Sequence, residues 1–151
     1  MYDYTEEVGN KLNDLLEKNY DAEKGYRKAA ENAKSDSLKR FFNRKAAERN
    51  SFGHEIKSEL KTYGQEPDKG GSVTGALHRT WMDTKALFSS DNDESMLEAA
   101  ITGERAALDD YEDALSDNEP RFPERTASIL KNQWSQIQSD LNKIKRLEDI
   151  S

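Results

Sequence analysis

Two polar positions stand out on the apolar stripes of the predicted helices. Glu104, one of 30 acidic residues in the chain, stands seven residues before Tyr111, and Asn19 stands seven residues before Tyr26. At 3.6 residues per turn, a spacing of seven places both members of each pair on the same face of a helix. A carboxylate or amide on such a face points into the predicted core, where it could bind a metal or form a buried hydrogen bond.

The two positions belong to an internal repeat with an offset of 85 residues. The matched pairs are Tyr26 with Tyr111, Ala22 with Ala107, and Ala29 with Ala114. Because they fall on the same helical face in both halves, they favour two similar helical hairpins. On the second helix of each hairpin, the same offset pairs Glu48 with Gln133 and Ser51 with Gln136.

This pattern resembles the ferritin-like superfamily, whose di-iron members take a Glu seven residues before a Tyr, and then a Glu-x-x-His, from each half. Of the six ligands that the resemblance implies, only Glu48 and Glu104 are present. The other four positions hold poor ligands for a di-iron site, namely Asn19, Ser51, Gln133 and Gln136. We expect these four to form a buried polar layer that satisfies the two glutamates, since unpaired polar groups are costly to bury.

A rebuilt metal site is the alternative. Glu23, Glu55 and Asp140 lie about one turn away from the same positions. Shared with Glu48 and Glu104, they would suit a single oxygen-loving cation better than a di-iron centre. We therefore expect no cofactor, with a divalent metal (Fe, Mn or Zn) as the alternative.

Other catalytic chemistry is not indicated. The absence of cysteine excludes disulfides, thiol catalysis and thiolate metal sites. No phosphate-cradling glycine loop, nucleophile elbow or His-Glu-x-x-His motif is present. His54 lies six residues beyond Glu48, so it points away from that face and is expected to be exposed or hydrogen-bonded. No catalytic residue is assigned, and we expect a protein that is not an enzyme.

Charge is distributed unevenly along the chain. The formal net charge of −7 argues against a nucleic-acid binder. Residues 91–119 hold eleven acidic residues and one base, Arg105, whereas residues 34–49 are predominantly basic. The bases of that second stretch are Lys34, Lys39, Arg40, Arg44, Lys45 and Arg49. We expect the two surfaces to attract each other, within the fold or between copies, with an anionic partner for the basic surface as the alternative.

Apolar residues recur at helical spacing in four long segments, approximately residues 5–33, 38–63, 94–116 and 123–149. A shorter helix is predicted over residues 73–88, and Gly64 is predicted to cap the end of the second segment. Nothing resembles a strand. The pattern predicts an all-α, ferritin-like four-helix bundle, with a short extra helix in the crossover between the second and third long helices, in a single domain over residues 1–151.

The crossover carries the most specific resemblance. Residues 71–83 read Gly-Ser-Val-Thr-Gly-Ala-Leu-His-Arg-Thr-Trp-Met-Asp, which is similar to a stretch of a bacterial four-helix-bundle family, domain-of-unknown-function family 2383. Further similarity lies in Gly25-Tyr26-Arg27, Glu48-Arg49 and Gly103-Glu104 with Tyr111. The resemblance implies a fold and a bacterial origin but no established activity. The company of that family suggests a stress-associated protein at the inner face of the cell envelope.

Three residues of this motif are candidate binding residues. Trp81 is expected to pack against the bundle together with Leu77, four residues earlier, while His78 and Arg79 fall beside that stripe. A packed crossover with His78 as a structural hydrogen-bonding group is one interpretation, and a binding site around His78, Arg79 and Trp81 is the other.

The depleted ligand set and the opposed charges favour a non-enzymatic, metal-free bundle that acts through its surface. It would act as a homo-oligomer, with a dimer favoured, or as a module that binds a protein partner. The alternative is a metal-binding or iron-handling ferritin-like protein with an atypical carboxylate site. No apolar run approaches membrane-spanning length and the N-terminus lacks a secretory signal, so we expect no membrane partner and a cytoplasmic location.

Overall fold

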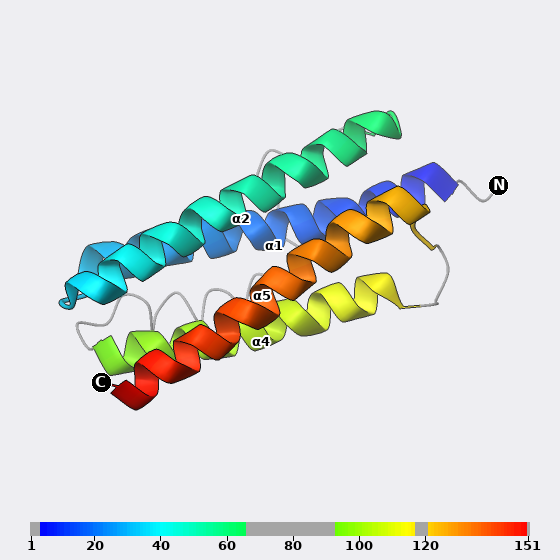
Figure 1. Cartoon of the computed structure of the whole chain (residues 1–151). Coiled ribbons are helices and arrows are strands. Elements are labelled where there is room, and N and C mark those ends of the chain that lie inside the picture. The colour runs from blue at the N-terminus through cyan, green and yellow to red at the C-terminus, as the bar shows by residue number, and fades with distance from the viewer. Residues whose placement is uncertain (1–3, 66–92, 117–120, 151) are drawn as a thin grey trace.

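The computed structural model describes residues 4–65, 93–116 and 121–150, and these residues form four long helices (Figure 1). The helices are α1 (Tyr4–Asn32), α2 (Asp36–Thr62), α4 (Asp93–Leu115) and α5 (Glu124–Ile150). No strand occurs among these residues. The predicted all-α four-helix bundle is thereby confirmed, with helix ends close to those expected from the sequence.

Local capping explains where α2 begins and ends. The hydroxyl of Ser35 accepts a hydrogen bond from the Leu38 N–H at 3.4 Å, which satisfies one free donor at the start of the helix. At the other end Gly64 has a φ of 69°, and its N–H donates to the Lys61 carbonyl. The Gln65 N–H donates to Leu60 in the same turn, which completes a Schellman motif. The predicted glycine cap is confirmed.

Hydrogen bonds at both ends of the bundle define its topology. The Asp93 carboxylate accepts the backbone N–H groups of Lys34 and Ser35 at 2.8 and 3.0 Å, so α4 begins beside the turn between α1 and α2. At the opposite end the side chains of Tyr63 and Thr126 hydrogen-bond, so α2 ends beside the start of α5. Helices α2 and α4 therefore run in the same direction (Figure 1).

Gln65 and Asp93 therefore lie at opposite ends of the bundle, as a crossover between the second and third long helices requires. The short helix predicted over residues 73–88 lies outside the described residues. His78, Arg79 and Trp81 belong to the same stretch, so their predicted roles stay predictions.

The core consists of the apolar stripes of all four helices. The predicted stripe of α1 is buried along its whole length, from Val8 to Ala33. Tyr26 of this stripe stacks on Phe42 of α2, with ring centroids 6.0 Å apart. On α5 the stripe continues through Leu130, while Trp134 is half-buried. None of the described helices is apolar over a long enough run to cross a membrane.

Candidate functional site

Polar side chains from all four helices are buried at the centre of the bundle. They are Asn19 on α1, Lys45 and Arg49 on α2, Glu104 on α4, and Gln133 and Asp140 on α5. Lys45 and Arg49 are four residues apart, so they lie on the same face of α2 and both point inward. Each helix thus contributes at least one polar group to a hydrogen-bonded network that apolar side chains enclose.

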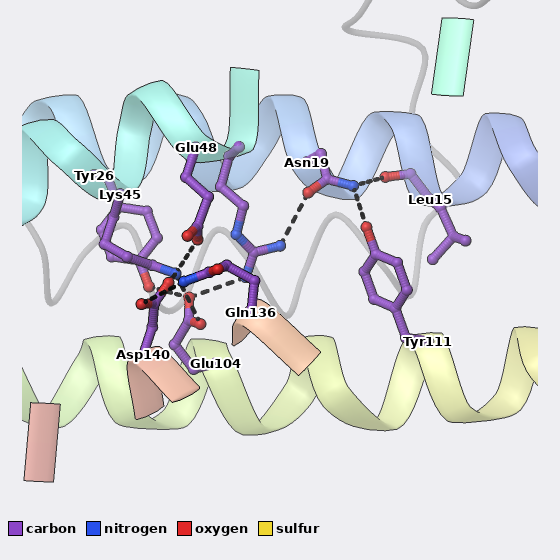
Figure 2. Close-up of polar contacts among 10 residues, drawn as sticks. Leu15, Asn19, Tyr26, Lys45, Glu48, Glu104, Tyr111, Gln136 and Asp140 are labelled. Atoms are coloured by element: carbon purple, nitrogen blue, oxygen red, sulfur yellow. Dashed lines mark hydrogen bonds and ion pairs between the residues drawn. The ribbon is translucent and has the colours of Figure 1, made fainter. Parts of the chain in front are cut away.

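Lys45 lies at one end of this network and binds three carboxylates (Figure 2). Its Nζ donates to Glu48 at 2.5 Å, to Asp140 at 2.7 Å and to Glu104 at 3.2 Å. The three acceptors come from three different helices, and the Lys45 side chain is only 1% exposed. The ammonium group therefore has one carboxylate oxygen for each of its three protons, which satisfies a buried lysine.

Arg49 connects Glu104 to Asn19. Its Nη2 donates to Glu104 Oε1 at 2.9 Å, and its Nη1 donates to Asn19 Oδ1 at 3.0 Å. Within the part of the chain that the structure describes, its buried Nε lacks a hydrogen-bond partner. Burial alone would lower the pKa of Arg49, but the Glu104 carboxylate together with Tyr26 and Tyr111 outweighs burial and holds that pKa above its usual value. Arg49 is therefore a fixed positive charge.

Glu104 is the acceptor shared by the two cations. It is fully buried, and it accepts hydrogen bonds from Lys45, Arg49 and the Tyr26 hydroxyl. Burial would raise the pKa of Glu104, but the charges of Arg49 and Lys45 outweigh it, and the pKa is lowered. Glu104 is therefore an ionised carboxylate inside the bundle.

The same arrangement recurs around Tyr111 with neutral partners. Asn19 Nδ2 donates to the Tyr111 hydroxyl at 3.0 Å, just as Tyr26 hydrogen-bonds Glu104. The positions of Tyr26 and Tyr111, and those of Asn19 and Glu104, are 85 residues apart. The repeat inferred from the sequence is therefore a structural repeat in which each tyrosine hydrogen-bonds a side chain of the other hairpin.

A second pair of contacts follows the same offset. Glu48 and Asp140 share a hydrogen bond, and 85 residues relate them to Gln133 and Glu55. The Gln133 Nε2 donates to Glu55 Oε1 at 3.1 Å, while the Gln133 Oε1 accepts from Tyr111 at 2.5 Å. One half of the network is thus built on carboxylates, and the other half is built mainly on amides.

The carboxylate half carries one more potential negative charge than it has cations. Glu48, Glu104 and Asp140 face Lys45 and Arg49. Burial, together with the hydrogen bond to Asp140, raises the pKa of Glu48 to about 7, although Lys45 opposes the rise. The pKa of Asp140 is lowered, because its hydrogen bonds to Glu48 and its pairing with Lys45 outweigh burial. A proton on Glu48 therefore balances the cluster near neutral pH.

The predicted polar layer is only partly buried. Asn19 and Gln133 are buried and belong to the network, but Ser51 and Gln136 are exposed, so they do not form part of a buried layer. Ser51 is two residues beyond Arg49, which places it about 200° round the helix from an inward-pointing side chain. Gln136 still donates to Asp140 at 3.2 Å from the outside.

The three carboxylates expected to help in a rebuilt metal site lie in different places. Asp140 reaches Lys45 in the centre. Glu23 is half-buried and accepts hydrogen bonds from Arg27 at 2.8 Å and Asn50 at 3.2 Å, away from the central network. Glu55 is exposed and accepts a hydrogen bond from Gln133 in the amide half of the network. His54, expected to be exposed or hydrogen-bonded, is exposed.

The sequence interpretation assigned Lys45 and Arg49 to a basic surface, which is wrong, because both are buried. A signal was available in the sequence. Phe41, Lys45, Arg49, Phe52 and Ile56 follow one another at intervals of four, four, three and four residues, so the two cations continue the apolar stripe of α2. Among the residues that the structure describes, no group of three or more Asp, Glu or His side chains is arranged to hold a metal ion.

A model of a known protein family matches most of the chain. The family model of a domain of unknown function (DUF2383) matches residues 7–117, from α1 to just beyond the end of α4. No curated protein matches the chain. The match covers the crossover and the carboxylates Glu48 and Glu104, while Asp140 lies beyond it.

Proposed function

Since the chain belongs to the DUF2383 family, a family of unknown function, its role has to be inferred from its own residues, and we propose that it is a non-enzymatic, metal-independent bundle that acts through its surface. We place it among ferritin-like bundles of bacterial origin, with a degenerate di-metal site and a cytoplasmic location. No cofactor is part of this proposal.

The occupation of the centre by Lys45 and Arg49 carries the proposal. Glu48 and Glu104 are the two carboxylates that the ferritin-like resemblance assigns to a metal, and both bind these cations. Buried charges persist only when they are paired and hydrogen-bonded. The ion pairs thus supply the positive charge that the carboxylates need, which supports a stable centre without metal.

The exposed charges support a role for the surface. At the start of α2 the exposed bases are Arg40 and Arg44, and Lys34 is exposed just before the helix. The exposed acidic residues of α4 are Glu94, Glu98, Asp109, Glu112 and Asp113. Each copy of the chain presents both surfaces, so two copies related by a two-fold axis could bring them together twice. We therefore favour a homodimer, with a protein partner of complementary charge as the second form of the proposal.

The convergence of three carboxylates favours one alternative function. Glu48, Glu104 and Asp140 present oxygen atoms to a single point, and hard divalent cations prefer oxygen ligands. A metal-binding or iron-handling protein would use these residues if a metal displaced Lys45.

Elemental analysis of protein purified without chelator distinguishes the two functions. We expect iron, manganese and zinc at well below one ion per chain, with no difference between the wild-type protein and Glu48→Ala or Glu104→Ala. Stoichiometric metal that is lost in either variant would establish the alternative and refute the metal-independent bundle.

A further inference from the structure

The three carboxylates around Lys45 form a cation site whose cation is part of the chain. Oxygen atoms of Glu48, Asp140 and Glu104 lie 2.5, 2.7 and 3.2 Å from one nitrogen. They come from α2, α5 and α4, so their positions depend on the packing of three helices. The ring of Tyr26, with its centroid 5.8 Å from the Lys45 Nζ, lies against the same ammonium group.

As they lie around Lys45, the three carboxylates of this described part of the chain are not arranged to hold a metal ion, and an inward shift would be needed to bring them into ligand positions. Magnesium, manganese and calcium take oxygen ligands, and magnesium and calcium bind them at about 2.0–2.6 Å, so the three oxygen atoms would need to move inward by about 1 Å or less. The carboxylates end flexible side chains, and such a shift is within their reach without any movement of the helices. What prevents binding is that the Lys45 ammonium already occupies the point where the oxygens converge.

We infer that Lys45 is a tethered cation filling a latent site for a hard divalent cation, and that it is the residue that keeps the centre of the bundle metal-free. This inference rests on the proposed metal-independent function and extends it, because it assigns metal exclusion to a single side chain. The ligands of the latent site are Glu48, Glu104 and Asp140.

Electrostatics drives the exchange of one cation for another. Without Lys45, only Arg49 would oppose the carboxyl groups of Glu48, Glu104 and Asp140, which leaves two uncompensated negative charges when all three are ionised. Buried unpaired charges are strongly destabilising, so the cluster must take up either protons or a cation. At pH 8 protons are scarce, and a divalent cation restores neutrality.

Arg49 does not have the same role. It contacts one carboxylate, Glu104, and its other contact is the amide of Asn19, so its removal exposes one carboxylate and one neutral oxygen. This donor set is too weak to hold a divalent cation in competition with water.

The test is Mn²⁺ binding at pH 8 by isothermal titration calorimetry, with the full chain as wild type, Lys45→Ala and Lys28→Ala. Lys28 is exposed, so its variant changes the net charge equally without touching the centre. We expect Lys45→Ala to bind roughly one Mn²⁺ per chain, at least about 10-fold tighter than the other two proteins. Adding Asp140→Asn to Lys45→Ala should weaken binding about 10-fold, because one ligand charge is lost.

Thermal unfolding measured with and without Mn²⁺ tests binding even when a variant is poorly stable. A ligand that binds only the folded state raises the melting temperature, so Mn²⁺ should stabilise Lys45→Ala and leave the wild-type protein unchanged. The double variant Lys45→Ala/Glu48→Gln removes one excess charge while it keeps Glu104 and Asp140, and it should also bind Mn²⁺.

The outcomes separate the two levels of the proposal. If neither Lys45→Ala nor Lys45→Ala/Glu48→Gln binds Mn²⁺ or is stabilised by it, the latent site is refuted and the metal-independent function stands. Tight Mn²⁺ binding by the wild-type protein would refute the metal-independent function itself.

Discussion

Glu48 is the carboxyl group at which the charge of the buried network is adjusted. Its side chain is 16% exposed, whereas Glu104 is fully buried and holds its charge between two cations. Because burial and the hydrogen bond to Asp140 raise the pKa of Glu48 to about 7, the folded protein holds a proton there that the unfolded chain has already lost. Stability therefore depends on pH in the neutral range.

Glu48→Gln should change that dependence. Between pH 4.5 and about 7 the folded state binds more protons at this position than the unfolded state, so the wild-type free energy of unfolding falls as pH rises. A neutral amide removes this contribution, which amounts to about 3 kcal/mol across the window. Denaturant unfolding from pH 4.5 to 8 should show that the free energy of unfolding of the variant, relative to that of the wild type, increases as pH rises. Glu98→Gln, at an exposed position, is the control, and an identical pH slope in all three proteins would contradict the assignment.

Arg49→Met should be strongly destabilising, because it removes one of the two cations that neutralise Glu104 and the donor to Asn19 Oδ1 inside the bundle. Breaking a buried ion pair by removing one member costs about 3–5 kcal/mol. The double variant Arg49→Met/Glu104→Gln should recover part of this loss, since the buried charge is then removed as well. Urea unfolding of the single and double variants gives the coupling energy, and purely additive effects would show that the two side chains do not interact.

At the scale of the elements, α2 supplies both cations that link the two hairpins at their centre. Lys45 contacts α4 and α5, while Arg49 contacts α1 and α4. The ends of the bundle are held separately, by Asp93 at the α1–α2 turn and by Tyr63 with Thr126 at the other end. Because α2 makes these contacts, the residues at which it begins and ends help to set where Lys45 and Arg49 lie along the bundle.

Gly64→Ala tests how α2 ends. The φ of 69° at Gly64 is unfavourable for any residue with a Cβ atom, and no atom of the described residues lies within 4 Å of the position of that Cβ, so we expect the effect to come from backbone strain. We expect a loss of about 1 kcal/mol in the free energy of unfolding. Gly53→Ala is the matched control within α2, where the new Cβ would meet Leu16 and Tyr20 at an ordinary 3.6 Å. It should be neutral or stabilising, and equal losses in the two variants would contradict the cap.

At the scale of the whole molecule, the burial of Lys45 and Arg49 reduces the basic surface that the sequence suggested. The exposed bases that remain near the start of α2 include Arg40 and Arg44. The acidic surface of α4 is also smaller than the sequence suggested, because Glu104 is buried in the core and Asp110 forms an ion pair with Lys18 at 3.0 Å. The remaining exposed charges are still opposite in sign, and pairs of exposed charges are weak individually.

A dimer held by these surfaces should therefore be sensitive to salt. We expect the molecular mass measured by light scattering to fall from dimer toward monomer as ionic strength approaches 1 M, where the screening length is about 3 Å. Arg40→Glu should weaken the dimer at low salt, whereas Lys143→Glu, an equal charge change on an exposed part of α5, should not. A dimer that persists in 1 M salt would point to an apolar interface. A monomer under all conditions would refute the dimer.

The sequence by itself determined the elements and their inward faces, because these depend on local spacing and capping. The stripe from Val8 to Ala33 follows the helical period, and Gly64 ends α2 as its type predicts. The repeat that pairs Tyr26 with Tyr111 was also visible, since both hairpins bury the same positions. The family resemblance is confirmed by the match over residues 7–117.

Only the tertiary structure decided which charged side chains enter the core. Lys45 and Arg49 have long side chains that can bury their stems and direct their charges outward, so their spacing on α2 does not determine where those charges lie. They are held inside because Glu104 and Asp140, 59 and 95 residues away from Lys45, are brought to the same level by other helices. Ser51 lies about 200° round α2 from the inward-pointing Arg49, and Gln136 is exposed on α5, so neither is buried at the centre. Partners so distant in sequence become neighbours only when the bundle is assembled, and the identity of the central cation depends on that assembly.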